Sequence, residues 1–191
     1  MFELHKLNFS YPRRQPLFEQ LSLSLPEQEN ILLQGENGCG KSTLLKLISG
    51  KLQPLNGEIK RPEAYFYLPQ EVENRILGIN LSQDLQLWEM AGLDLAKLKS
   101  HPLVANFPAE YWELPLRELS QGSKQAYLLS IAFCHTRHYL LLDEPYPALD
   151  KERRQILTEE LSQRRGMLVV SHFKPELSFD RILTLQKGNL Q

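Results

Sequence analysis

The stretch Gly35 to Ser42, GENGCGKS, lies between the apolar run Ile31-Leu32-Leu33 and the helix-like segment TLLKLISG. It fits the pattern G-x-x-x-x-G-K-[ST], in which backbone N–H groups and a helix N-terminus surround phosphate oxygens. Lys41 can reach the β- and γ-phosphates, and the Ser42 hydroxyl can bind Mg²⁺. A glycine-rich turn is the alternative, but both flanks have the required character. The stretch therefore predicts binding of a nucleoside triphosphate.

The composition is that of one globular domain of ordinary size. The chain has 191 residues, of which 42% are hydrophobic and 24% are charged, and its net charge is −1. This charge gives no general attraction to nucleic acid or anionic lipid. No apolar stretch approaches the ~20 residues that span a bilayer, and the beginning MFELHKLNFS lacks the apolar core of a signal peptide. We expect a soluble cytoplasmic protein that leaves any membrane spanning to another subunit.

The two cysteines do not suggest a disulfide framework. Cys39 lies inside the phosphate loop, and Cys134 lies in an apolar helix-like run. His135 and His138 beside Cys134 could suggest a metal site, but no second ligand group is visible. The end of a helix is the preferred interpretation.

Hydrophobic periodicity predicts an α/β fold. Residues 21–25 alternate leucine with serine, as in a half-buried antiparallel strand, whereas Ile31–Leu33 is a continuous run typical of a central strand. Thr43–Ser49 has a helical pattern, with Gly50 as its expected C-cap. Further strands are expected at residues 64–68, 139–142, 167–170 and 181–185, with a hairpin turn at residues 187–189. Alternating strands and helices predict a sheet with helices on both faces.

The region from about residue 76 to 119 has a different character. Leu81, Leu85 and Trp88 follow helical spacing, and prolines at 102, 108 and 115 divide the rest into short pieces. We expect a small helical insert, about residues 76–119, within one domain that covers residues 1–191. The ATP-binding core then takes about residues 1–75 and 120–191.

Two carboxylates follow the apolar strand that ends at Leu142. In a phosphate-loop protein, an acid such as Asp143 holds Mg²⁺, and a neighbour such as Glu144 can orient or deprotonate the attacking water. A strand that ends in solvated acids is the alternative, and the phosphate loop upstream favours the functional interpretation.

Ser120 and His172 are ambiguous by themselves. Ser120 precedes the apolar helix AYLLSIAF as a natural N-cap, which describes an anion site and an ordinary helix start equally well. His172 ends the apolar run Met167–Val170, where a single histidine is usually a surface residue.

Taken in order, these segments resemble the nucleotide-binding subunit of ABC transporters over nearly the whole chain. GENGCGKS resembles its Walker A motif, LSQGSKQ stands where the family has LSGGQ, and LLLDEP resembles Walker B. The resemblance implies a P-loop NTPase core of the ABC ATPase type, with an N-terminal antiparallel β-subdomain, ATP and Mg²⁺ as ligands, and ATPase activity. It also implies head-to-tail packing with a second ABC ATPase subunit, identical or different, and with transmembrane transporter subunits. We therefore expect a peripheral protein on the cytoplasmic face of the cell membrane, with no nucleic acid partner.

The resemblance assigns a role to each matching residue. Lys41, Glu144 and His172 are expected to be catalytic, Asp150 belongs to the D-loop, and Ser42, Gln70 and Asp143 are expected to hold Mg²⁺. The expected nucleotide-binding residues are Tyr11, which would stack on adenine, and Asn37, Gly38, Cys39, Gly40, Lys41, Ser42, Thr43 and Gln70. The expected signature, acting on the partner's ATP, is Ser120, Gln121, Gly122 and Ser123.

The signature departs from the family pattern. Gln121 replaces the first glycine and Ser123 replaces the glutamine, while Ser120 and Gly122, which face the γ-phosphate in the family, are kept. Gln28 also replaces a glycine that is frequent before Walker A. An altered signature permits a regulatory subunit with weak hydrolysis, although the presence of Lys41, Glu144 and His172 argues against it.

A finer resemblance follows Gln70. PQEVENRILGINLSQDLQL is similar to a segment of energy-coupling factor ATPases, which power uptake of vitamins and of cobalt or nickel ions. Glu73, Ile76, Gly78 and Asp84 align with it, but that family usually continues well past residue 191, so another importer or exporter remains an alternative. A soluble ABC protein acting on ribosomes or DNA is a further alternative; such proteins carry tandem domains or long coiled-coil insertions, which this sequence lacks.

Overall fold

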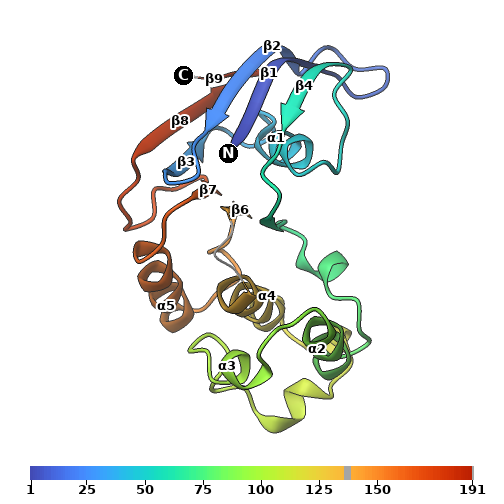
Figure 1. The fold of residues 1–191 in the computed structure, drawn as a ribbon, viewed down its shortest axis with the longest axis vertical. Coiled ribbons are helices and arrows are strands. Elements are labelled where there is room, and N and C mark those ends of the chain that lie inside the picture. Colours follow the sequence, from blue (N-terminus) through green and yellow to red (C-terminus); the bar gives the residue numbers. More distant parts are fainter. Residues whose placement is uncertain (136–138, 191) are drawn as a thin grey trace. The chain divides into compact units, whose positions relative to one another are not determined.

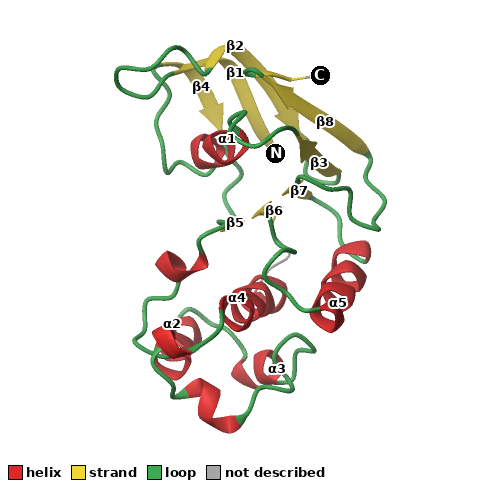
Figure 2. Cartoon of the chain, turned by 180° about the vertical axis from the view of Figure 1, so that it is seen from behind, coloured by secondary structure: helices red, strands yellow, loops and turns green. Residues whose placement is uncertain are grey.

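The computed structural model describes residues 1–135 and 139–190, which form two compact units. Among these residues, the first unit comprises 1–67, 139–144 and 164–190, and the second comprises 68–135 and 145–163. Figure 2 shows strands and α1 in the first unit and α2 to α5 in the second. The expected boundaries of core and insert stay predictions. The alternative of a metal site at Cys134, His135 and His138 stays untested. It depends on His138 and on the side chain of His135, which lie outside the described part of the chain.

The first unit contains a six-stranded sheet, of which β3, β6, β7, β8 and β9 are labelled in Figure 1. Its strand order is β5-β6-β7-β3-β8-β9, and β3 pairs in parallel with β7 and β8. The central position explains the continuous apolar run of β3, since both faces of such a strand are covered. β8 and β9 form the predicted hairpin. The strands are β3 (Asn30–Gln34), β5 (Tyr65–Leu68), β6 (Tyr139–Asp143), β7 (Met167–Val170), β8 (Arg181–Gln186) and β9 (Asn189–Leu190).

The predicted antiparallel β-subdomain is a three-stranded sheet with the order β2-β1-β4. It consists of β1 (Phe2–Phe9), β2 (Phe18–Leu25) and β4 (Asn56–Lys60). The leucine–serine alternation of β2 places Leu21 and Leu25 in the core and leaves Ser22 and Ser24 exposed. Together the two sheets confirm the α/β fold class with an antiparallel subdomain.

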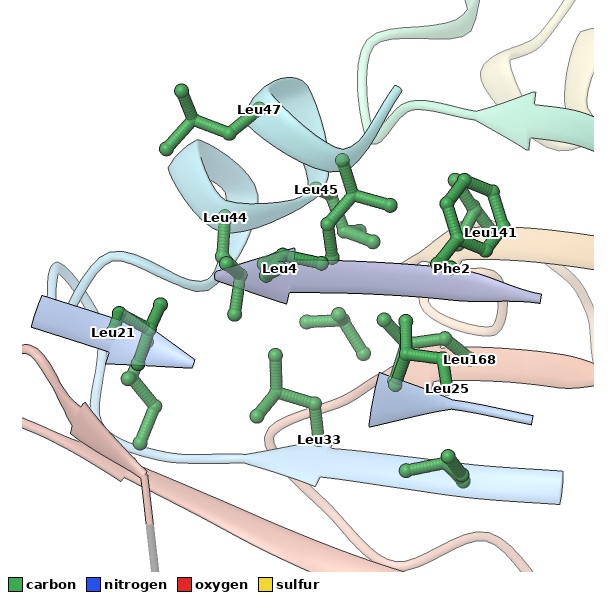
Figure 3. Packing of buried hydrophobic residues seen from close by; sticks show 14 of the residues in the cluster. Phe2, Leu4, Leu21, Leu25, Leu33, Leu44, Leu45, Leu47, Leu141 and Leu168 are labelled. Atoms are coloured by element: carbon green, nitrogen blue, oxygen red, sulfur yellow. The ribbon is translucent and has the colours of Figure 1, made fainter. Parts of the chain in front are cut away.

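Helix α1 (Lys41–Ile48) joins both sheets in one hydrophobic core. Leu44 and Leu45 of α1, Leu4 of β1 and Leu33 of β3 are all buried in this cluster, and Figure 3 shows them facing a shared interior. The helix ends one residue earlier than predicted, with Ser49 as C-cap. The side chain of Arg61 donates hydrogen bonds to the last carbonyls of the helix, 2.9 Å to Leu47 and 2.8 Å to Ile48. The core therefore fixes the helix that follows the phosphate loop.

The second unit is helical. The predicted helical segments between residues 76 and 119 are α2 (Leu81–Met90) and α3 (Leu95–Lys99), and short 3₁₀ turns occupy Val72–Arg75, Ala109–Trp112 and Leu116–Glu118. The long apolar helix α4 (Gln121–His135) and the more polar α5 (Lys151–Ser162) complete the unit. No helix in the described part of the chain is both long and apolar enough to cross a lipid bilayer.

A buried carboxylate connects α2 with α4 and with the turn before α2. Asp84 is only 1% exposed and accepts hydrogen bonds from the Tyr127 hydroxyl at 2.8 Å and the Trp88 indole N–H at 3.0 Å. It also accepts the backbone N–H groups of Leu77 at 2.6 Å and Gly78 at 3.4 Å. Burial, followed by the neighbouring Asp84 carboxylate, raises the pKa of the Tyr127 hydroxyl, so this hydroxyl stays a donor. Asp84 thereby fixes the turn at residues 76–80 to α4, the helix that begins at the predicted signature.

Replacing Asp84 by alanine should destabilise the protein by about 2–4 kcal/mol, because the buried Tyr127 hydroxyl and three further donors lose their acceptor. The matched control is Glu89→Ala on the same helix, whose exposed side chain should change stability by less than about 0.5 kcal/mol. Urea titration followed by circular dichroism measures both free energies of unfolding. Equal stability of the two variants would contradict the structural role of Asp84.

Candidate functional site

The register of the parallel sheet gathers three predicted site segments at one edge. β7 lies between β3 and β6, and Val170 is level both with Leu33 of β3 and with Asp143 of β6. The phosphate loop follows β3, Glu144 follows β6, and His172 follows β7. Since these strands are parallel, their carboxyl ends meet at one edge, where ligands of such sheets bind. The loop residues Gly35, Glu36 and Asn37 line an open pocket there together with His172 and Thr184.

The phosphate loop is held in one shape by its own contacts. Gly35 has φ +152° and lies so close to β8 that an added Cβ would be 2.4 Å from the Leu185 carbonyl oxygen. Lys41 Nζ donates hydrogen bonds to the carbonyl oxygens of Gly35 at 2.7 Å and Glu36 at 2.9 Å, and the side chain is 7% exposed. Helix α1 begins directly after Gly40, its N-cap. The free backbone N–H groups of its first turn and the Lys41 ammonium are therefore next to the loop.

Tyr11 lies beside the start of α1. Its hydroxyl and the Thr43 hydroxyl are 3.1 Å apart, and its ring packs edge-on against Phe9. The half-buried ring is therefore anchored at both ends next to a residue of the phosphate-loop helix. The structure brings together Tyr11 and Thr43, two of the predicted nucleotide-binding residues.

Asp143 is a buried carboxyl group that faces the phosphate-loop helix. It is 2% exposed, and its Oδ1 has no hydrogen-bond partner within the described part of the protein. Burial is the main reason that the pKa of Asp143 is raised; Glu144 raises it further, and the Ser42 hydroxyl, Lys46 and Lys41 oppose the shift. A buried oxygen without a partner next to a hydroxyl fits a hard divalent cation. No cluster of three or more His, Cys, Asp or Glu side chains suited to a metal occurs in residues 1–135 and 139–190.

Glu144 and His172 contact each other at the ends of β6 and β7. His172 Nδ1 and Glu144 Oε2 are 3.0 Å apart, with the side chains 11% exposed for the glutamate and 54% for the histidine. Glu144 has φ +50°, a left-handed conformation that is uncommon outside glycine. Its backbone N–H donates to the Val170 carbonyl at 3.0 Å, which holds the residue there. Strained backbone of this kind recurs where a side chain must be aimed, and here it aims the carboxylate at the histidine.

The predicted signature residues lie at the start of α4 in the second unit. Ser120 is the predicted N-cap, since its hydroxyl oxygen accepts the Ser123 N–H at 3.0 Å. The Ser120 and Ser123 hydroxyls are 2.9 Å apart. Gln121 is exposed, whereas Gly122 and Ser123 are buried.

The D-loop packs directly on this helix start. A Cβ on Gly122 would lie 2.4 Å from the Ala148 carbonyl oxygen, so only glycine permits this approach. Asp150 caps α5 by accepting the Arg153 N–H at 2.9 Å. Arg154 donates to the carbonyls of Leu149 at 2.8 Å, Tyr146 at 3.1 Å and Pro147 at 3.0 Å, and so fixes the loop.

Gln70 belongs to a different unit from Ser42 and Asp143, the other predicted metal ligands. It is an exposed residue at a bend after β5 and belongs to the second unit. Its expected contact with Mg²⁺ stays a prediction.

Sequence reasoning did not single out Lys124 and Arg154. The Lys124 side chain is 5% exposed and forms an ion pair with Glu73, which ties the segment after Gln70 to α4. Lys124 lies next to a long apolar run, and this position could have indicated that its side chain is buried and paired. Arg154 gave none, because a charged residue in a polar helix usually faces solvent.

These features define a class of protein, the P-loop nucleoside triphosphatases with a separate helical signature segment. The sequence profile described as "ABC transporter" matches residues 18–147. The chain belongs to the ABC transporter family of ATP-binding, ATPase domains.

Several relatives show this similarity. The chain is 31% identical over 183 residues to "ATP-binding protein Uup-like" of Haemophilus influenzae, covering 90% of this chain and 39% of that protein. It is 32% identical to "Molybdate import ATP-binding protein MolC" of the same species, covering 87% and 70%. It is 26% identical to "Energy-coupling factor transporter ATP-binding protein EcfA2" of Methanospirillum hungatei, covering 100% and 54%. The chain spans only 24% to 39% of the length of the first three curated relatives it matches.

Solved structures share the fold. An ATP-binding subunit of an ABC transporter superposes with a TM-score of 0.79 at 26% identity, covering 98% of this chain and 87% of that one. A dimeric ATP-binding cassette in a post-hydrolysis state with ADP and phosphate gives a TM-score of 0.78 at 18% identity, covering 100% and 98%. These similarities confirm the predicted ABC ATPase fold.

The raised pKa of Asp143 has a consequence for stability. The folded protein binds this proton more tightly than the unfolded chain, so the group's favourable contribution is present below the ordinary pKa of 3.8 and is lost as the pH rises through the raised value. Asp143→Asn should therefore gain stability relative to the parent as the pH rises from about 4 toward neutral, without nucleotide and with EDTA. Thermal unfolding across this range measures the difference. Glu58→Gln, an exposed control, should show none; a flat difference for Asp143→Asn as well would contradict the burial effect.

Proposed function

We propose that this chain is the ATP-binding and ATP-hydrolysing motor subunit of an ABC transporter. The observation that carries the proposal is the shared edge where the phosphate loop, the buried Asp143 and the Glu144–His172 pair meet. The loop would hold the phosphates, Asp143 would hold a cation, and Glu144 in contact with His172 would act on water; these are the parts that phosphoryl transfer to water requires.

ATP would lie along α1, with its phosphates in the loop. Lys41 would exchange its carbonyl contacts for the β- and γ-phosphate oxygens, and the ring of Tyr11 would stack on adenine. The Ser42 hydroxyl and Asp143 Oδ1 fit Mg²⁺, and Gln70 is the further expected ligand. The bound ion would neutralise charge on the β- and γ-phosphates.

Glu144 would polarise the attacking water, and His172 would hold Glu144 and contact the γ-phosphate. The 3.0 Å contact and the left-handed backbone of Glu144 keep this carboxylate in place before substrate binds, which reduces reorganisation during the reaction.

The site would be completed by a second ABC ATPase subunit, identical or different. Ser120 and the backbone of Gly122 would act on the ATP held by the partner, as donors at a helix N-terminus. The D-loop with Asp150 would lie at the same interface, because Ala148 packs on Gly122. Similarity to a dimeric ATP-binding cassette supports this arrangement.

Transport through separate membrane subunits is the proposed use of hydrolysis, which places the chain at the cytoplasmic face of the cell membrane. Relatives named for molybdate import and for an energy-coupling factor transporter support this use. Because of the second relative, vitamins or cobalt or nickel ions stay the proposed cargo. The second candidate is a non-transport ABC ATPase, favoured by relatives named only as ATP-binding proteins.

Co-purification from native membranes separates these two functions. Recovery of stoichiometric multi-spanning subunits with this chain supports the motor. Recovery of the ATPase without any membrane protein, in detergents that preserve other transporters, would contradict it.

Lys41→Ala should weaken ATP binding by about 10- to 100-fold, because a charge-assisted hydrogen bond to phosphate is worth about 1.5–3 kcal/mol. Isothermal titration calorimetry with Mg-ATP measures the change. Lys51→Ala, an exposed lysine just after α1, is the control and should bind like the parent. Equal affinity for Lys41→Ala would show that the loop does not hold the triphosphate.

Glu144→Gln keeps the shape of the side chain and removes the base. ATP should still bind, while turnover in the assembled complex falls by about 100-fold or more and an ATP-bound dimer accumulates. Phosphate release and light scattering measure the two effects, with Glu58→Gln on β4 as the control. Parental turnover in Glu144→Gln would assign the base to another residue.

A further inference from the structure

The two altered positions of the signature differ in their surroundings. Gln121 is exposed, but Ser123 is 4% exposed and its hydroxyl lies 2.9 Å from the Ser120 hydroxyl. We propose that Ser123 is a positioning residue that orients the Ser120 hydroxyl, so that its proton points toward the γ-phosphate of the partner's ATP. The inference rests on the proposed function, which gives Ser120 its contact with ATP.

Hydrogen-bond capacity sets the direction of this contact. A serine hydroxyl has one proton to donate and two lone pairs to accept with. One lone pair of Ser120 Oγ is already occupied by the Ser123 N–H at 3.0 Å. The second hydroxyl contact, with Ser123 Oγ, then uses either the remaining lone pair of Ser120 or its only proton.

Only one of these arrangements leaves Ser120 able to act. If Ser120 donates to Ser123, its proton is directed into the protein and none remains for the phosphate. If Ser123 donates to Ser120, both lone pairs of Ser120 are filled and its proton must point outward. The ionised oxygens of a γ-phosphate are acceptors, so they select the second arrangement.

Burial makes Ser123 suited to this task. Its hydroxyl has little access to water that would compete for its proton, and the capping bond fixes the separation of the two serines. The Ser120 hydroxyl, held by two defined hydrogen bonds, loses less freedom on binding phosphate than one that rotates freely. Ser123 thus provides a local contact in a signature that lacks the family's glutamine.

The test is a double-mutant cycle on the ATPase activity of the full chain in its assembled complex. Ser123→Ala should lower kcat about three- to tenfold, since one hydrogen bond is lost while the Ser120 cap remains. ATP affinity of the isolated chain should stay unchanged, because the serine pair acts on the partner's nucleotide. Ser123→Thr, which keeps the hydroxyl, should restore kcat.

The control is Ser130→Ala, which removes another buried hydroxyl from α4, one that donates to the Tyr127 carbonyl at 2.7 Å. It should leave kcat within about twofold of the parent, which separates loss of a buried hydroxyl from loss of positioning. Thermal unfolding of each variant confirms that the compared proteins are folded.

Non-additivity decides the assignment. In a Ser120→Ala background, Ser123→Ala should have no further effect on kcat, because no hydroxyl remains to orient. A further fall in that background would overturn the proposal, as would an unchanged kcat for Ser123→Ala alone beside a reduced kcat for Ser120→Ala. An unchanged kcat for Ser120→Ala would instead remove the signature from the proposed mechanism.

Discussion

The parallel pairing of β3 and β6 on either side of β7 is the constraint on which the site depends. Each strand is short and nearly all of its side chains are buried, so the register is fixed by apolar packing on both faces. A shift of one residue would turn every side chain to the opposite face of the sheet. The phosphate loop, Asp143 and His172 then share an edge because this register brings the carboxyl ends of the three strands level.

That core allows an unfavourable group to persist at the edge. Asp143 has a raised pKa and an oxygen without a hydrogen-bond partner among the described residues, which lowers stability when the carboxylate is ionised. In the proposed function, a cation bound with nucleotide would relieve the same penalty. Binding of the ligand would thereby be coupled to stabilisation of the fold, since whatever binds only the folded state stabilises it.

The helical unit uses buried polar groups in a different way. Asp84 and Lys124 bind side chains that lie far away in the sequence, whereas Arg154 binds carbonyl groups of the loop just before its own helix. Such contacts have strict geometry, because an unpaired buried polar atom is costly. They give the signature helix and the D-loop a defined shape, which contacts between apolar side chains alone specify less sharply.

The sequence by itself determined the phosphate loop, the strands that precede Asp143 and His172, and the N-cap at Ser120. These follow from local rules, in which strand burial, loop glycines and capping residues are read over a few positions. It also identified the family, because seven motifs occur in the expected order. It did not reveal that the exposed strand β4 pairs with β1. Nor did it reveal that Arg154 of the polar helix α5 supports the preceding loop.

Only the tertiary structure decided which polar side chains are buried and what they bind. Asp84 meets Tyr127 from 43 positions away, and Lys124 meets Glu73 from 51 positions away. In the sequence, Asp84 and Lys124 are ordinary charged residues of helical segments. The contact between the Ser120 and Ser123 hydroxyls spans three residues, yet its burial depends on how the rest of the unit covers the helix start. Local pattern fixes where such groups stand, and long-range packing fixes what they do.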